Sequence, residues 1–180
     1  MAHTSDALAL PAPLAEVVEV GFEWDYDEET DEASGCDFEP FDRFEEPERT
    51  AWWFRLWTGN QEADGGEFRF FGKTGCGDYT GFWLVRPGAP VAEQPVVHIG
   101  SEGERGVLAR DLGDLLWLFA AGLGPAEAFD DPESPAEPND AFRAIAERHA
   151  PGRHRSPARI VGDARAEFPH FSDHIDAMCR

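Results

Sequence analysis

Among the residues that could do chemistry in this chain, the first to weigh is the segment Gly72-Lys73-Thr74. A phosphate-binding P-loop has the pattern G-x-x-x-x-G-K-[ST], in which backbone N–H groups and the lysine hold the phosphates. The first glycine of that pattern would fall at position 67, where the chain has Glu67. The segment also lies between two predicted strands, whereas a P-loop precedes a helix. We therefore predict no nucleotide site here.

Cys76 lies in the same glycine-rich segment and stands in the position of a nucleophile. Catalysis by a cysteine needs a neighbouring base, and no motif ties a histidine to Cys76. His170 and His174 are four residues apart, a spacing that places two zinc ligands on one helix face. No third ligand follows at a telling spacing, so we predict surface histidines and neither a metal nor a cofactor. An enzyme that uses Cys76 stays an alternative.

Acidic residues dominate the composition. The 180 residues include 36 Asp+Glu against 15 Lys+Arg, which gives a formal net charge of −21. A field of this sign repels phosphate backbones, so direct binding of nucleic acid is not expected. Either the charge serves solubility alone, or it forms a face for a basic partner. For such a face we expect the acidic stretch 25–32, predicted to be a solvated loop, and within it Asp25, Asp27, Glu28 and Glu29.

The cysteines and the N-terminal residues bear on the compartment. Cys36, Cys76 and Cys179 are odd in number and form no C-x-x-C pair, which argues against a disulfide scaffold and a zinc knuckle. Residues 1–20 contain no Lys or Arg, and two prolines break their apolar part, so no secretion signal is expected. No apolar run approaches the roughly 20 residues that span a bilayer. The sequence thus predicts a cytoplasmic protein, monomeric or weakly dimeric, without membrane contact.

Hydrophobic patterning predicts one α+β domain over residues 15–180, preceded by a flexible tail over residues 1–14. Partial alternation over residues 15–24 predicts a strand. Three phenylalanines, spaced by three, are expected to pin an irregular segment onto the body; they are Phe38, Phe41 and Phe44.

A short helix is predicted after Pro47, a residue that suits a first helical turn. Gly59 suits its end, because glycine readily adopts the left-handed conformation that stops a helix. We expect Trp53, Leu56 and Trp57 to face the core, and a strand is the alternative, since aromatic residues fit either element.

The rest of the chain predicts a sheet followed by helices. Strands are predicted over residues 67–71, 82–85, 95–99 and 107–109, the first two forming a hairpin around the glycine-rich turn. Helices are predicted over residues 111–122, from Asn139 to His149, from Ser156 onward and over 172–179. An acidic, proline-rich linker is expected over residues 130–138.

The central segment resembles the SUKH superfamily, which joins a fungal cell-wall-synthesis regulator of Smi/Knr type to many bacterial immunity proteins. The family pattern is an aromatic-rich strand, F-G-x-x-G-x-G-D, an apolar strand, P-V-V, an acidic residue and a leucine-rich helix. The residues that match are Phe71, Gly72, Gly75, Gly77, Asp78, Pro95, Val96, Val97 and Glu102, followed by the helix over 112–119. Upstream, Trp57, Gly59 and Asn60 fit one bacterial subgroup. The match covers roughly residues 50–126 and, more loosely, helices within 139–179; Lys73, Cys76 and residues 15–50 depart from the pattern.

The resemblance implies a non-catalytic domain with a mostly antiparallel sheet of about 4–6 strands flanked by helices. The glycines and Asp78 of the turn would then be structural. The resemblance also implies an immunity protein that neutralises a toxin, often a nuclease, and nucleases are commonly basic because they bind phosphates. A regulatory or scaffolding module without a toxin partner is the alternative, ahead of the Cys76 enzyme.

Overall fold

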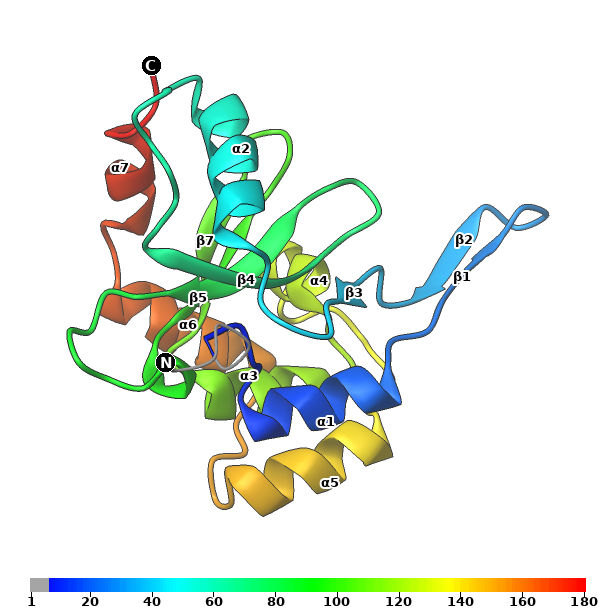
Figure 1. Cartoon of the computed structure of the whole chain (residues 1–180). Coiled ribbons are helices and arrows are strands. Elements are labelled where there is room, and N and C mark those ends of the chain that lie inside the picture. The colour runs from blue at the N-terminus through cyan, green and yellow to red at the C-terminus, as the bar shows by residue number, and fades with distance from the viewer. Residues whose placement is uncertain (1–6) are drawn as a thin grey trace.

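An antiparallel five-stranded sheet forms the centre of the structure, a computed structural model that describes residues 7–180 (Figure 1). Its strands are β3 (Glu39–Pro40), β4 (Phe68–Lys73), β5 (Tyr79–Trp83), β6 (Val96–Ile99) and β7 (Arg105–Ala109). They pair in this same order, so each strand lies beside its neighbours in sequence. The predicted α+β class and the antiparallel sheet are confirmed, and within this sheet the sequence did not predict strand β3.

Seven α-helices surround the sheet within the described part of the chain. They are α1 (Ala12–Val20), α2 (Pro47–Thr58), α3 (Leu112–Ala120), α4 (Pro125–Asp130), α5 (Asp140–His149), α6 (Pro157–Glu167) and α7 (Phe171–Asp176), with a 3-10 turn η1 (Val91–Glu93). A separate two-stranded sheet, β1 (Trp24–Asp27) and β2 (Glu32–Gly35), projects from the body (Figure 1). Helix α4 was not predicted, because its six residues are too few to show a helical period.

Helices cover both faces of the five-stranded sheet. One face, which includes Phe71 and Phe82, joins the hydrophobic cluster of α1, α3 and α5. The other face, which includes Phe70 and Trp83, packs with residues of α2 and α7. Successive residues of a strand point to opposite faces, so both faces must be covered to bury β5 along its whole length.

The N-terminal segment differs most from the prediction. The strand predicted over residues 15–24 is wrong, because α1 occupies Ala12–Val20 and buries Leu14 and Val17, which are three residues apart on one helix face. The tail predicted over residues 1–14 is also wrong for residues 8–14, since Leu8 and Leu10 pack against the core. Residues 1–6 lie outside the described part of the chain.

Helix α2 has the predicted limits but not the predicted buried face. Gly59 follows it with a φ of 67° and so ends it in the left-handed conformation. The fully buried side chains lie one turn apart, at Thr50, Phe54 and Thr58, and Leu56 is 68% exposed. Trp53 and Trp57 are partly buried against the sheet, because they flank this stripe.

Three of the later helices begin where they were predicted to begin, and a side chain caps each start. The side chain of Asp111 accepts a hydrogen bond from the N–H of Asp114 at 3.0 Å, Asn139 accepts from Phe142 at 3.0 Å, and Ser156 accepts from Arg159 at 3.3 Å. Phe38 and Phe44 are buried and Phe41 packs against the core, so the predicted anchoring of their irregular segment is also confirmed.

Candidate protein-interaction site

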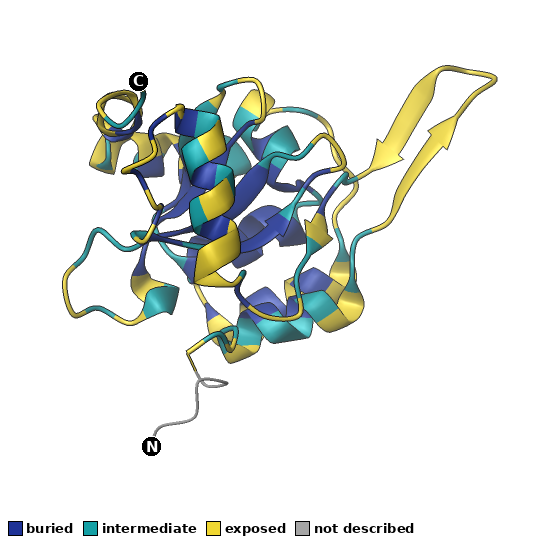
Figure 2. Cartoon of the chain, turned by 45° about the horizontal axis from the view of Figure 1, so that its top comes forward, coloured by how far each residue is buried: buried dark blue, intermediate teal, exposed yellow. Residues whose placement is uncertain are grey.

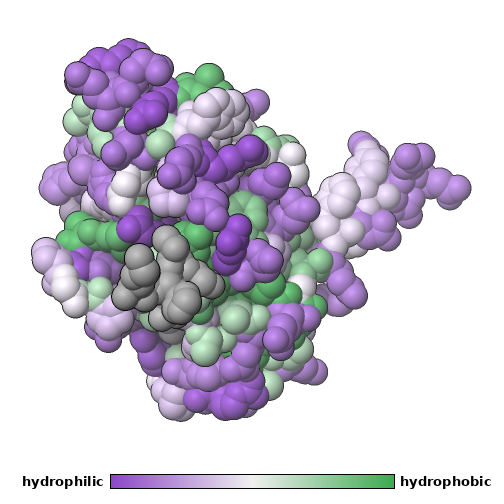
Figure 3. Space-filling view, viewed as in Figure 1, coloured by the Kyte–Doolittle hydropathy of each residue, from purple (hydrophilic) through white to green (hydrophobic). Residues whose placement is uncertain are grey.

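The most prominent exposed element is the β1–β2 hairpin, residues 24–35, which we call the arm. All twelve of its residues are exposed, and it extends away from the body (Figure 2). In the space-filling view it is a predominantly hydrophilic projection (Figure 3). The solvation predicted for the acidic stretch 25–32 is confirmed, but the predicted loop is wrong, because the strand-forming residues Trp24 and Tyr26 alternate with the acids.

The arm has two chemically different faces. Residues that oppose each other in an antiparallel pair share a face. Trp24 opposes Gly35 and Tyr26 opposes Ala33, so one face carries two aromatic rings beside small residues. The opposite face carries Asp25 opposite Ser34 and Asp27 opposite Glu32, and is therefore acidic.

The turn at the end of the arm is held by its own carboxylates. Asp27 Oδ1 accepts hydrogen bonds from the N–H groups of Glu29 at 2.8 Å and Thr30 at 3.3 Å. Asp31 adopts a left-handed conformation with a φ of 59°, and its carboxylate accepts a hydrogen bond from the Tyr26 hydroxyl, which raises the pKa of Tyr26. Among the four residues predicted to form a partner face, Asp27 thus also shapes the turn. Asp25, Glu28 and Glu29 form no ion pair with any described residue.

The base of the arm is fixed to the core. The Cys36 N–H donates to the Glu23 carbonyl at 2.9 Å and closes the hairpin. Gly35 has a φ of 85°, and a Cβ there would lie 2.0 Å from the same carbonyl oxygen, so the closure requires glycine. Phe22 precedes the arm in the sequence and Phe38 follows it, and their rings pack edge to face with centroids 5.2 Å apart. The arm therefore projects from an ordered base.

The glycine-rich turn between β4 and β5 connects three segments. Asp78 accepts hydrogen bonds from the Ser101 N–H at 2.7 Å and the Thr74 hydroxyl at 3.0 Å. Burial raises the pKa of Asp78, but these hydrogen bonds outweigh burial and hold the pKa below its usual value. On the other side, the Gly75 N–H donates to Asp37 at 3.0 Å, which ties the turn to the segment that follows the arm.

Steric constraints explain why two further positions of the family pattern are glycine. A Cβ on Gly72 would lie 2.3 Å from the ring of Phe38, so glycine lets the Phe38 ring pack onto β4. Gly77 has a φ of 91°, which side-chain-bearing residues rarely adopt.

The upstream motif residues hold neighbouring segments together. Trp57 Nε1–H donates to the Gly100 carbonyl at 2.8 Å, which joins α2 to the β6–β7 turn. Asn60 donates through Nδ2 to the Met178 carbonyl at 2.8 Å and so fixes the C-terminal segment. Glu102 is exposed in the β6–β7 turn.

Cys76 forms no hydrogen bond with a histidine within residues 7–180, and the histidines gather in no metal-binding group there. Cys76 is exposed and lines a small pocket with His98, but no hydrogen bond joins Cys76 to a described histidine. His174 instead contacts Glu67, with Nε2 and Oε2 2.8 Å apart, and His170 contacts Asp173 at 3.3 Å. No described group of three His, Cys, Asp or Glu residues is placed to hold a metal ion.

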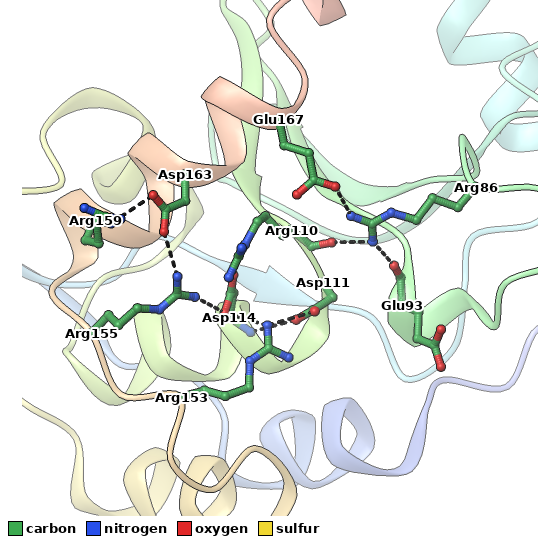
Figure 4. Close-up of polar contacts among 10 residues, drawn as sticks. All are labelled: Arg86, Glu93, Arg110, Asp111, Asp114, Arg153, Arg155, Arg159, Asp163 and Glu167. Carbon is green, nitrogen blue, oxygen red and sulfur yellow. Dashed lines mark hydrogen bonds and ion pairs between the residues drawn. The ribbon is translucent and has the colours of Figure 1, made fainter.

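A charged network that the sequence reading missed lies at the start of α3 (Figure 4). Asp114 is fully buried and accepts hydrogen bonds from Arg110 Nε at 3.0 Å, Arg153 Nη2 at 2.8 Å and Arg155. Burial raises the pKa of Asp114, but the hydrogen bonds from Arg155 and Arg110 and the nearby positive charges outweigh it and lower the pKa. Asp163 extends the network to Arg159 at 2.9 Å.

This network uses much of the positive charge of the chain in a structural role. Four of the 15 Lys+Arg residues take part; they are Arg110, Arg153, Arg155 and Arg159. Because Arg153 and Arg155 precede α6, their bonds fasten the α5–α6 connection to α3. Long-range pairing of this kind has no local signature in the sequence.

Comparison with known proteins gives no relative: no family model matches the chain, and no curated protein or solved structure matches it significantly. None of the described helices combines the length and the apolar character needed to cross a membrane.

Proposed function

We propose that this chain is a non-catalytic binding protein whose arm engages a basic protein. We further propose that it is an immunity protein of SUKH type, which neutralises a basic, nuclease-type toxin. The single observation that carries the binding proposal is the arm itself, an ordered hairpin that is exposed along its whole length.

An exposed hairpin of this composition favours binding over a purely solvating role. Solubility requires charge but not exposed aromatic rings, and the arm presents Trp24 at 53% and Tyr26 at 44% exposure. Tryptophan and tyrosine are enriched among the residues that contribute most binding energy at protein interfaces. The acids on the opposite face would meet Lys and Arg of the partner at the edge of the interface.

The distribution of charge supports a basic partner. The chain has a formal net charge of −21, and several of its few cations are held in the network around Asp114. Long-range attraction of this magnitude speeds encounter with a positively charged protein and repels nucleic acid.

The family resemblance supports the immunity role. The matching residues are those that hold the β4–β5 turn, the β6–β7 turn and α2 together, through Asp78 and Trp57. A toxin partner would also account for the exposed aromatic rings of the arm. A regulatory module of the same family would share this fold, and the nature of the partner distinguishes the two.

The test begins with affinity capture on the full chain, followed by purification of the captured protein and measurement of its activity with and without the chain. The proposal predicts a basic partner whose activity the chain abolishes at a 1:1 ratio. A partner whose activity is unchanged by the chain would favour the regulatory module. An acidic partner, or none, would contradict the proposal.

A further inference from the structure

A second acidic feature, which we call the turn pocket, lies between the β4–β5 turn, the β6–β7 turn and α4. Its volume is about 250 Å³. This is below the range of roughly 300–1,000 Å³ typical of small-molecule sites, so the turn pocket suits a single side chain. Four carboxylates line it; they are Asp78, Glu102, Glu104 and Asp130.

These four carboxylates have no positively charged partner in the described chain. None of them takes part in an ion pair. Two arginines of neighbouring segments are engaged elsewhere: Arg105 pairs with Asp176, and Arg165 donates to the Phe129 carbonyl at 2.9 Å. Like charges gathered around one pocket repel each other, and a cation placed between them would relieve that repulsion.

His98 is the second, independent feature of the turn pocket. His98 lines the turn pocket although it is only 3% exposed. Its Nδ1 atom has no hydrogen-bond partner among the described residues. Buried polar atoms are normally paired, and one that is not calls for an unseen partner. A hydrogen-bond donor that enters the turn pocket would supply the partner that the protein does not.

The shape of the site selects among cations. No group of three ligands is placed to hold a metal ion within residues 7–180. The lining ring of Phe129 is already covered, by His98 with ring centroids 5.1 Å apart and by the Arg165 guanidinium 5.4 Å from its centroid, so the polar groups decide which cation fits. A guanidinium group is planar and carries five N–H donors, so it can reach carboxylates on several elements at once. An ammonium group is compact and offers neither the plane nor the spread of donors.

The turn pocket and the arm lie on connected segments. The β4–β5 turn that contributes Cys76 and Asp78 to the turn pocket also binds Asp37, just beyond the arm, through Gly75. We infer that the turn pocket binds the guanidinium group of an arginine side chain, presented by the same protein that the arm engages. The identity of the protein that carries the arginine rests on the proposed function, whereas the chemistry of the turn pocket does not.

The experiment uses the full chain and N-acetyl-L-arginine N-methylamide, an arginine whose ends are neutral, as the probe. Binding is followed by the backbone amide NMR signals of Ser101 and Glu104. We expect saturable shifts with this probe, weaker binding of the lysine analogue, and none of the neutral citrulline analogue, which keeps the shape without the charge.

Two variants with equal loss of charge locate the binding. Glu104→Gln/Asp130→Asn should weaken binding of the arginine probe by about tenfold or more. Glu62→Gln/Glu147→Gln removes two exposed carboxylates outside the turn pocket and should leave binding of the arginine probe unchanged. Equal thermal midpoints of the two variants establish that both fold. No saturable shift, equal binding of citrulline, or equal weakening in both variants would overturn the inference. Because no protein partner is present, these outcomes are separate from failure of the proposed function.

Discussion

Trp24 and Tyr26 stack on one face of the arm, with ring centroids 6.3 Å apart and planes 9° from parallel. Two positions apart on β1, they stand beside Gly35 and Ala33 of β2, which leave their rings uncovered. Aromatic rings held together in this way form a preordered apolar surface, and preorganisation lowers the entropy lost on binding. The arrangement makes the aromatic face of the arm the first place to test by substitution.

Removing either ring should weaken binding without weakening the fold. Trp24→Ala is expected to cost about 2 kcal/mol of binding free energy or more, a loss of about 30-fold in affinity. Because Trp24 and Tyr26 are exposed and outside both core clusters, the free energy of unfolding should change by less than about 0.5 kcal/mol. Calorimetric titration with the purified partner and urea unfolding measure the two quantities. Tyr26→Phe, which keeps the ring and loses its bond to Asp31, is the control for Tyr26→Ala.

Substitutions in the network around Asp114 should weaken the stability of the fold. Asp114→Ala leaves Arg110, Arg153 and Arg155 without their shared acceptor. Because these arginine side chains are 25–35% exposed, the loss should lie below the value of about 3–5 kcal/mol that is typical when one partner of a fully buried ion pair is removed. Urea unfolding measures this, with Asp163→Ala as the comparison, since Asp163 is 25% exposed and its loss should cost less. Equal and small effects of the two changes would show that the network contributes little.

The same carboxylate predicts a pH dependence of stability. The pKa of Asp114 is lowered in the folded protein, so the folded state releases this proton more readily than the unfolded state. Its contribution is therefore complete above the unfolded pKa of about 3.9 and is lost as the pH falls through the folded value. The difference in unfolding free energy between the wild type and Asp114→Asn should be constant near neutral pH and shrink in acid. A difference that grows on acidification would contradict the assignment.

Substitution of Cys76 tests whether the protein uses this cysteine in catalysis. Cys76 is exposed and no described histidine bonds to it, so Cys76→Ser should leave both binding and neutralisation of the partner unchanged. Titration and the activity assay measure this side by side. Loss of neutralisation with intact binding and an unchanged thermal midpoint would favour an enzyme built on Cys76.

The central sheet and most helices could be predicted because their signals are local. Leu112, Leu115 and Leu116 repeat at helical spacing, and Asp111 caps the helix they form. The glycine-rich turn was predicted from its composition, and a Cβ on Gly72 would clash while Gly77 has a positive φ. The strand predicted over residues 15–24 was wrong, because Val18 and Val20 are spaced at the period of a strand, whereas the buried pair Leu14 and Val17 is spaced at that of a helix.

The candidate site could be predicted only in part. The acidic stretch of the arm was visible as a charge run, whereas the two faces follow from the pairing of Trp24 with Gly35, which the sequence does not reveal. The turn pocket joins residues up to 52 positions apart, from Asp78 to Asp130, and the network around Asp114 spans 41 positions to Arg155. Such contacts depend on the tertiary fold and have no local pattern.

The most direct test of the account is calorimetric titration of the purified partner with two variants that lose equal charge. One neutralises the arm through Asp25→Asn, Asp27→Asn, Glu28→Gln and Glu29→Gln; the asparagine at 27 keeps an acceptor for the turn. The other changes four exposed glutamates outside the arm to glutamine, at Glu48, Glu62, Glu133 and Glu147.

The account predicts that the arm variant binds the partner about tenfold more weakly or worse, with a shallower dependence of affinity on salt. The control variant should retain affinity close to that of the wild type. Unchanged affinity of the arm variant, or equal weakening of both variants, would contradict the central claim that the arm is the binding site.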